Sequence, residues 1–566
     1  MTQFPVLAQA TSTAVPWHIL DTLILGAFFL ALVLIVLWVL FKKEETTSDY
    51  FLAGRDAGWI SIGSSIFASN IGSEHLVGLA GAGFVSGMAM AHWEMHAWLI
   101  LVLGWVFVPF YDRIKVFTMP EFLELRFSAP SRLILSFISL VSYVLTKVAV
   151  TVYSGGVVFG TVFGIDRISL FGREYDLFWV SAIGLVVVTG IYTVLGGMRA
   201  VMYTSVLQTP VLLIGSVVIL VVGLIKVGGW GEVERLVGDN IHLIRPSNDP
   251  EFPWTGVLFG SMIIGFWYWC TDQYIVQRVL SGRNQKEARR GAILAGYFKL
   301  LPVFIFLIPG MIAFALFQKG MLTLPLNSAG QPDGDTAFSS LVAQLLPIGF
   351  KGVVVCGLLA ALMSSLASLF NSSAALFVGD FYTRLKPNAS QRHLVVVGRI
   401  ATACVVILGI VWIPVMRGMG NVLYRYLQNV QGLLAPAIAS VFVLGVFWKR
   451  ATAAGGLAGL SLGFALGMFR LGLDVVRDRL TPGSLLYQAA AINWLHVCEL
   501  LFILCVLTII VVSLLTQPPT EKMKRYTYGA ATTAEKLETR KSWNGWDVLH
   551  TAIILSVIVA FYIYFW

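Results

Sequence analysis

Long apolar runs, each about the length of a membrane-spanning helix, dominate the pattern of this chain from residue 17 to its end. A hydrocarbon core of about 30 Å is crossed by about 20 helical residues. Glycines, prolines and charged residues separate the runs and predict about fourteen transmembrane helices. The expected spans are 17–41, 57–81, 88–111, 130–164, 177–197, 199–227, 254–279, 288–318, 351–384, 392–416, 421–447, 452–475, 487–515 and 546–566. Only Gly196-Gly197 separates the fifth span from the sixth.

Composition supports an all-α polytopic membrane protein. Of the 566 residues, 57% are hydrophobic and 12% are charged, whereas a soluble domain carries about 25% charged residues. This excludes a soluble or a disordered chain. A β-barrel is also excluded, because its strands would alternate over segments of about ten residues. All five cysteines fall inside apolar runs, so neither a disulfide framework nor a cysteine metal site is expected.

The distribution of positive charge predicts the orientation in the membrane. With the N-terminus outside, the cytoplasmic loops hold 24 Lys and Arg residues and the outer loops hold 8, as the positive-inside rule requires. We therefore expect a multi-pass protein of an inner or plasma membrane with both termini outside. The net charge of +9 follows from these loops and does not indicate nucleic-acid binding. The polar stretch 516–545 reads as a cytoplasmic linker.

The second span is interrupted near its middle by Ser69-Asn70-Ile71-Gly72-Ser73-Glu74-His75. Small and hydrogen-bonding residues around a glycine favour an unwound stretch whose carbonyls line a cavity, as in transporters with discontinuous helices. A continuous helix that uses these polar residues to bond its neighbours is the alternative.

The span 351–384 carries Ala361, Ser364, Ser365 and Ser368 on one helical face. Such a hydroxyl stripe suits a hard cation that prefers oxygen ligands, although serines also commonly join helices within a membrane.

Polar and aromatic residues in other spans suggest a shared cavity. They are Glu94, Lys147, Trp267-Tyr268-Trp269, Lys299, Gln428 and Gln431. Ionisable residues within membrane spans usually mark a pathway, and rings combined with amides and charges suit a polyhydroxylated ligand. Gly455, Gly459, Gly463 and Gly467 leave one helix face bare, which favours packing within the chain over a weak dimer.

Several ordered motifs resemble the sodium/solute symporter family, most closely its sodium/glucose cotransporter branch, including sugar- and inositol-transporting members. They are Phe51-Leu52-Ala53-Gly54-Arg55, Phe67-Ala68-Ser69-Asn70-Ile71-Gly72-Ser73, Gly196-Gly197, Trp267-Tyr268-Trp269-Cys270-Thr271-Asp272-Gln273, Leu362-Met363-Ser364-Ser365-Leu366 and Phe447-Trp448-Lys449-Arg450. The similarity runs from about residue 20 to residue 515.

The resemblance implies one transporter domain over residues 1–566, with a LeuT-like core of two inverted five-helix repeats and discontinuous helices. The repeats would be 57–227 and 254–447, flanked by the peripheral helix 17–41 and by the peripheral segment 452–566. The family's main sodium site matches Ala68, Ile71, Ala361, Ser364 and Ser365, and its sugar contacts match Asn70, His75, Glu94, Tyr268, Trp269, Lys299 and Gln428. Tyr268 would be the inner aromatic gate.

Three departures from the family pattern bear on substrate and coupling. Gly265 stands where sugar-transporting relatives often have Thr, and Glu74-His75 is similar to the inositol-transporting relatives. Ser205 replaces an acidic residue that some members use for a second cation or a proton. We therefore expect one sodium ion per substrate. The lack of the cysteine-rich outer loop of animal members suggests a bacterial source.

The resulting hypothesis is a sodium-coupled symporter of a hexose-like sugar or cyclic polyol, a monomer or weak dimer in the lipid bilayer. No Walker A loop, GxSxG elbow or HExxH motif is present, so an enzyme is not expected. A solute sensor without net transport, and a proton-coupled or uniport sugar carrier, are the alternatives.

Overall fold

The computed structural model describes residues 17–566, except 43–44, 73, 164–166, 171, 328–329, 348 and 419–422. It also leaves undescribed the side chains at positions 74, 145–146, 149, 157, 161, 170, 413, 415–418, 423–429 and 478.

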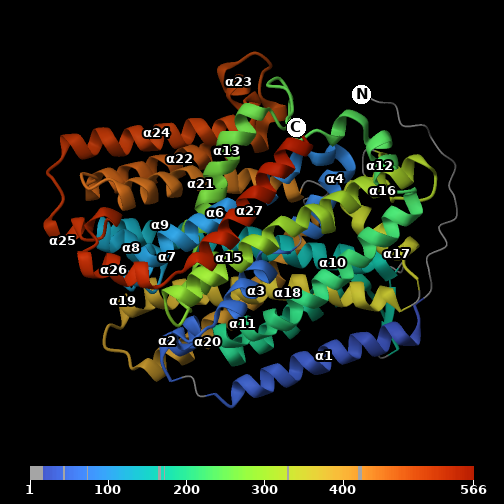
Figure 1. The fold of residues 1–566 in the computed structure, drawn as a ribbon, viewed down its shortest axis with the longest axis horizontal. Helices are drawn as coiled ribbons and strands as arrows, with labels where there is room; N and C mark the ends of the chain where they lie inside the picture. Colours follow the sequence, from blue (N-terminus) through green and yellow to red (C-terminus); the bar gives the residue numbers. More distant parts are fainter. Residues whose placement is uncertain are drawn as a thin grey trace.

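The described chain is almost entirely helical (Figure 1). Its first half contains α1 (Ile19–Leu40), α2 (Thr47–Leu52), α3 (Trp59–Asn70), α4 (Ala80–Ser86), α5 (Ala91–Glu94), α6 (Ala97–Val102), α7 (Val108–Ile114), α8 (Met119–Arg126), α9 (Ala129–Ser142), α10 (Ala149–Phe163), α11 (Leu177–Val227), α12 (Trp230–Val237), α13 (Trp254–Phe266) and α14 (Gln273–Leu280). The second half contains α15 (Gln285–Pro302), α16 (Ile308–Gln318), α17 (Ala337–Leu345), α18 (Phe350–Leu376), α19 (Thr383–Leu385), α20 (Gln391–Gly418), α21 (Leu423–Phe447), α22 (Ala453–Val476), α23 (Leu485–Ala491), α24 (Trp494–Leu515), α25 (Glu521–Lys524), α26 (Thr533–Lys541) and α27 (Gly545–Tyr564).

Within the described residues, ten helices are long and apolar enough to cross a membrane. About half of the expected spans lie on single helices, while the others are divided by π-helical segments or breaks. The hydrophobic pattern correctly predicts a multi-pass helical membrane protein. The count of fourteen crossings remains a prediction.

Two expected spans, 177–197 and 199–227, form the single long helix α11. Its 51 residues would extend about 77 Å if straight, more than twice a hydrocarbon core. Gly197 interrupts it with φ 48° and ψ −147°, a left-handed conformation that favours glycine. A Cβ there would lie 2.4 Å from the carbonyl oxygen of Tyr50. The structure thus places a sharp kink at the predicted break.

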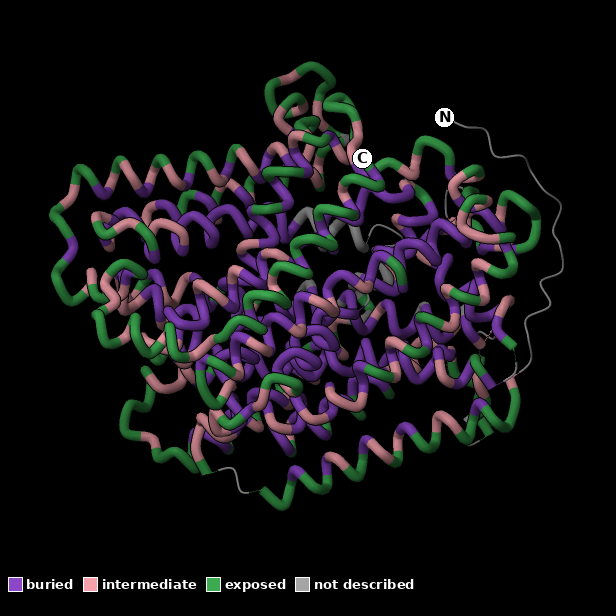
Figure 2. The backbone as a smooth tube through the Cα atoms, viewed as in Figure 1, coloured by how far each residue is buried: buried purple, intermediate pink, exposed green. Residues whose placement is uncertain are grey.

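Burial separates a central group of helices from a peripheral one. In α18 the most apolar stretch is 89% buried, compared with 22% in α1 and α27 and 33% in α24. Figure 2 shows the same contrast, with α1 and α24 largely exposed at the edges and buried chain concentrated between them. Helix α18 packs against α3, α11 and α20, so the serine stripe lies inside the protein.

The glycine face of α22 packs within the chain, as its spacing predicts. A Cβ on Gly459 would lie 2.3 Å from the Ile509 side chain, and one on Gly467 would lie 2.6 Å from the Leu433 carbonyl oxygen. These contacts bring α22 against α24 and α21.

One short sheet was not expected from the sequence. Strands β1 (Arg167–Leu170) and β2 (Arg173–Asp176) form an antiparallel pair in the segment that reads as an outer loop. The strands are too short and polar to give an apolar alternation that could be recognised.

Candidate functional site

Two broken helices place polar side chains and free backbone groups in the protein interior. Helix α3 ends at Asn70, and Ile71 is extended (φ −76°, ψ 109°) before a π-helical segment begins at Glu74. Helix α13 continues into a π-helical turn, Trp267–Thr271, and the extended Asp272 precedes α14. The first break is the unwound stretch predicted from the polar run 69–75. Helix ends of this kind leave backbone groups available to ions and ligands.

A cavity lined mostly by buried residues lies between these two breaks. Its lining residues come from α3, the two π-helical segments, α5 and the turn after it, α13, α15 and α21. They are Asn70, His75, Leu79, Trp93, Glu94, His96, Ile264, Gly265, Tyr268, Trp269, Lys299 and Gln431.

A chain of polar contacts crosses this cavity. Lys299 Nζ donates to Glu94 Oε2 at 2.6 Å, and His75 Nε2 lies 3.4 Å from Glu94 Oε1. The amide nitrogen of Asn70 is 3.3 Å from the same imidazole nitrogen. Lys299 Nζ also lies 5.3 Å from the centre of the Trp269 ring, a cation–π distance. These contacts fix the side chains before any ligand binds.

Three polar atoms among the lining residues are buried and have no hydrogen-bond partner within the described part of the chain. They are His75 Nδ1, Trp93 Nε1 and Gln431 Nε2. An unpaired buried polar atom costs about 1–3 kcal/mol, so these atoms favour a ligand that supplies several hydrogen-bonding groups. Aromatic walls with unpaired donors and acceptors suit a polyhydroxylated ring.

Aromatic residues and a second ion pair lie beside this cavity. Lys147 Nζ is 3.0 Å from Asp272 Oδ2, and the Tyr143 hydroxyl donates to the other carboxylate oxygen. The same ammonium lies 4.7 Å from the Tyr268 ring centre and 4.8 Å from that of Tyr274. This cluster holds the Tyr268 side of the cavity in place.

The serine stripe of α18 faces the break in α3. Ser365 Oγ donates to the carbonyl oxygens of Ser69 (2.9 Å) and Ile71 (3.1 Å). Ser368 Oγ lies 2.6 Å from Ser69 Oγ. A Cβ on Gly72 would approach Ser365 Oγ to 2.7 Å, so glycine permits this close contact. Hydroxyl and carbonyl oxygens without a carboxylate form a donor set suited to Na⁺.

Ser205 lies next to this stripe. Its Oγ donates to the Val201 carbonyl oxygen at 2.6 Å and lies 3.3 Å from Ser364 Oγ. It therefore contributes a neutral oxygen, bonded within its own helix, at the position where a carboxylate would bring negative charge.

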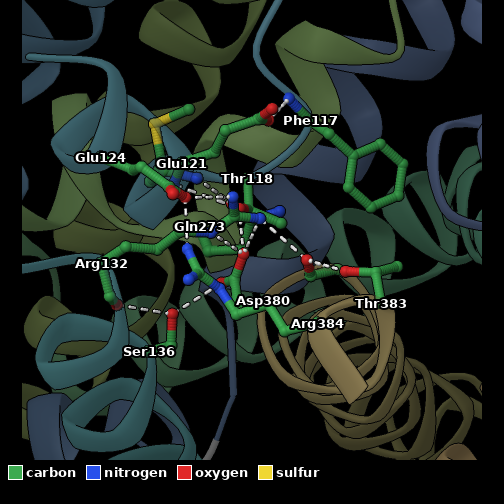
Figure 3. Close-up of polar contacts among 12 residues, drawn as sticks. Phe117, Thr118, Glu121, Glu124, Arg132, Ser136, Gln273, Asp380, Thr383 and Arg384 are labelled. Atoms are coloured by element: carbon green, nitrogen blue, oxygen red, sulfur yellow. Dashed lines mark hydrogen bonds and ion pairs between the residues drawn. The ribbon is translucent and has the colours of Figure 1, made fainter. Parts of the chain in front are cut away.

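A separate network surrounds the buried carboxylate of Asp380 at the end of the molecule that carries α8 and α19 (Figures 1 and 3). Arg132, Thr118 and Ser136 all donate to it, at 2.8, 2.8 and 2.6 Å. Arg132 and Arg384 also pair with Glu124. Partial burial raises the pKa of Glu124, but these two arginines bring it below its ordinary value. The network joins α8, α9, the π-helical segment Phe377–Tyr382 that follows α18, and α19, on the predicted cytoplasmic side.

The structure brings together six of the seven residues matched to sugar contacts, namely Asn70, His75, Glu94, Tyr268, Trp269 and Lys299. The seventh, Gln428, has a side chain outside the described residues. Of the residues matched to the sodium site, Ala68 and Ile71 lie at the end of α3, and Ala361, Ser364 and Ser365 are buried on α18, which packs against it. Both assignments remain predictions.

Sequence reasoning missed four cavity residues: Leu79, Trp93, His96 and Ile264. Trp93 comes one residue before Glu94 and His96 comes two residues after it. Their closeness to Glu94 in the sequence was the only sign that they line the cavity. The partner of Lys147 was also missed, because Asp272 is 125 residues away in the chain.

The fold and this site define a membrane-embedded transporter of a small solute. The sodium:solute symporter family model matches residues 50–463. The chain is 36% identical over 551 residues to sodium/glucose cotransporter 1 of Oryctolagus cuniculus, covering 90% of this chain and 82% of that one. It is 37% identical over 534 residues to sodium/myo-inositol cotransporter 2 of the same species, covering 89% and 78%. The chain belongs to the sodium:solute symporter family.

Solved structures show the same fold. A Na⁺-coupled sialic acid symporter in a substrate-bound, outward-open state is 23% identical, with a TM-score of 0.73 over 89% of this chain and 99% of that one. Mhp1, a nucleobase-cation-symport-1 family transporter, is 17% identical with a TM-score of 0.50 over 86% and 99%. As a family member, the chain is a multi-pass transporter with Na⁺ as its coupling ion, rather than an enzyme.

Proposed function

We propose that this protein couples the inward flow of sodium to the uptake of a hexose-like sugar or cyclic polyol by alternating access. The observation that carries the proposal is the cavity between the two broken helices, where three unpaired polar atoms accompany a buried ion pair and aromatic walls. The sodium/glucose and sodium/myo-inositol cotransporters among its relatives support this substrate class.

The coupling ion would bind beside the substrate. Carbonyl oxygens at the end of α3 (Ala68, Ile71) and oxygens of α18 (Ala361, Ser364, Ser365) would be its ligands. Ser365 contacts the Ile71 carbonyl, and Ile71 follows directly after Asn70, which lines the substrate cavity. A cation bound here would hold the unwound segment in place, so sodium would organise the substrate site.

Alternating access would use the two five-helix repeats 57–227 and 254–447 as bodies that move relative to each other. The breaks in α3 and α13 belong one to each proposed repeat, and substrate would bind between them.

One sodium ion per substrate supplies enough free energy to accumulate the substrate inside the cell. One charge crossing about 100 mV gains about 2.3 kcal/mol, and a tenfold sodium gradient adds about 1.4 kcal/mol. Together they allow roughly 500-fold accumulation of substrate. Both termini would lie outside, in an inner or plasma membrane.

Counterflow of labelled glucose and labelled myo-inositol into proteoliposomes tests the proposal. Saturable counterflow that requires sodium on the substrate side is the expected result. Sodium-dependent binding without flux would indicate a sensor, and flux that follows a pH gradient instead of sodium would indicate a proton-coupled carrier. Either outcome would overturn the proposal.

A further inference from the structure

His96 occupies space that exists because residue 265 is a glycine. A Cβ on Gly265 would lie 2.6 Å from His96 Nδ1 and 2.7 Å from Leu99 Cδ1. Real Cβ atoms do not approach neighbours this closely, so any larger residue would displace the imidazole. The absent side chain of Gly265 and the position of the His96 ring are therefore two parts of one arrangement.

The imidazole is also held from its other side. His96 Nε2 lies 3.2 Å from Ser261 Oγ. Ser261 and Gly265 are four residues apart on α13 and share a helical face. One turn of α13 thus provides an anchor for one ring nitrogen at Ser261 and, at Gly265, the room that the other ring nitrogen occupies.

The hydrogen bond to Ser261 uses Nε2, and no hydrogen bond of His96 Nδ1 is found within the described part of the chain. His96 and Gly265 both line the cavity that contains Glu94 and Lys299. Whether Ser261 donates to Nε2 or accepts from it, Nδ1 is left with the complementary role. A ligand hydroxyl can both donate and accept, so it satisfies either tautomer.

We propose that His96, positioned by Ser261 and Gly265, is a specificity-determining residue that hydrogen-bonds one ring hydroxyl of the substrate through Nδ1. This inference rests on the proposed sugar or polyol function. On the Gly265 side of the cavity, this contact would select ligands that carry a hydroxyl at the matching ring position. It would act in addition to the contacts that Glu94 and Lys299 make with the substrate.

The test combines changes in the protein with changes in the ligand, as in a double-mutant cycle. Binding of glucose and myo-inositol, and of their monodeoxy analogues, would be measured by calorimetry on the purified full chain at saturating sodium. In the parent protein, one monodeoxy analogue of the better ligand should bind about tenfold more weakly, as expected for one lost hydrogen bond. His96→Leu, which keeps the apolar volume beside Gly265, should weaken binding of the parent ligand about tenfold and leave binding of that analogue unchanged.

Gly265→Ala should reproduce the loss by displacing the ring. In a His96→Ala background the same change should have little further effect on binding, since the collision with the imidazole is gone and only the contact with the Leu99 side chain remains. Gly184→Ala is the matched control, because a Cβ there meets no atom within 4 Å.

The outcomes separate this inference from the function on which it rests. If neither ligand binds the parent protein, the proposed function fails and the inference fails with it. If the parent protein binds ligand and His96→Leu weakens all analogues equally, or none of them, His96 has only a packing role and the inference alone is wrong. Ser261→Ala keeps the question answerable if the His96 variants do not fold, because loss of the anchor should reduce discrimination against the same analogue.

Discussion

Lys299 Nζ and Glu94 Oε2 lie 2.6 Å apart, and both side chains are about 95% buried. Their residues are 205 positions apart in the sequence, on α15 and α5. His75 and Trp269 contact the same pair, which makes it the electrostatic centre of the proposed substrate cavity. A buried pair of this kind repays its desolvation only while both charges are present.

Removing one member of this pair should destabilise the protein strongly. Glu94→Gln leaves the Lys299 ammonium uncompensated, at an expected cost of about 3–5 kcal/mol. Glu94→Gln/Lys299→Gln should be more stable than the single variant, because no unpaired charge remains. Unfolding in detergent would measure this. The exposed pair Arg283–Asp56, at 2.7 Å, is the control: Asp56→Asn should change stability by at most about 1 kcal/mol. Equal costs at the two sites would contradict the argument.

Ser365→Ala should raise the sodium concentration needed for half-maximal uptake. The change removes the hydroxyl that contacts the Ser69 and Ile71 carbonyls, while alanine fits the same helix. Sodium activation of substrate uptake in proteoliposomes measures the effect. Ser373→Ala is a matched control on α18, because the Ser373 hydroxyl has no hydrogen-bond partner among the described residues. An unchanged sodium requirement in the Ser365 variant would exclude this hydroxyl as a ligand.

Gly459→Val should destabilise the contact between α22 and α24. A Cβ at this position would already lie 2.3 Å from the Ile509 side chain, and valine adds two further methyl groups. Overpacking of this kind costs about 1–3 kcal/mol, and thermal unfolding in detergent would detect it. Gly472→Val is the control in the same helix, since a Cβ there meets no atom within 4 Å. If both variants melted at the same temperature, the packing role of the glycine face would be wrong.

Local sequence predicted the features that depend on neighbouring residues. The run of small polar residues around Ile71 predicted the break in α3, and Gly196-Gly197 predicted the kink in α11. Both are backbone properties that short segments encode. The four-residue spacing of Gly455, Gly459, Gly463 and Gly467 similarly predicted a packed helix face.

Pairings between distant segments could not be predicted in the same way. Lys299 and Glu94 were each recognised as unusual, but only the folded chain shows that they neutralise each other. The relation between His96 and Gly265 depends on how α13 packs beside the segment after Glu94. A histidine two residues after a glutamate carries no sign of that distant neighbour in its own sequence.

The number of sodium ions transported with each substrate depends on the region around Ser205. The Ser205 hydroxyl donates to Val201 within its own helix and lies 3.3 Å from Ser364 Oγ. A second Na⁺ held here would have neutral oxygens around it, and desolvating a cation is costly without a nearby opposite charge. We therefore expect one sodium ion per substrate.

Reversal potentials measured across set sodium and substrate gradients in proteoliposomes give this ratio directly. With a ratio of one, a tenfold sodium gradient should balance a tenfold opposing substrate gradient at zero membrane potential, because the two terms in the free energy carry equal weight. Ser205→Asp places a carboxylate beside Ser364 and is the informative variant: a ratio that rises from one toward two would show that charge at this position was the missing element. A ratio of two in the parent protein would mean that carbonyl and hydroxyl oxygens suffice for a second ion, and the inference from Ser205 would be wrong.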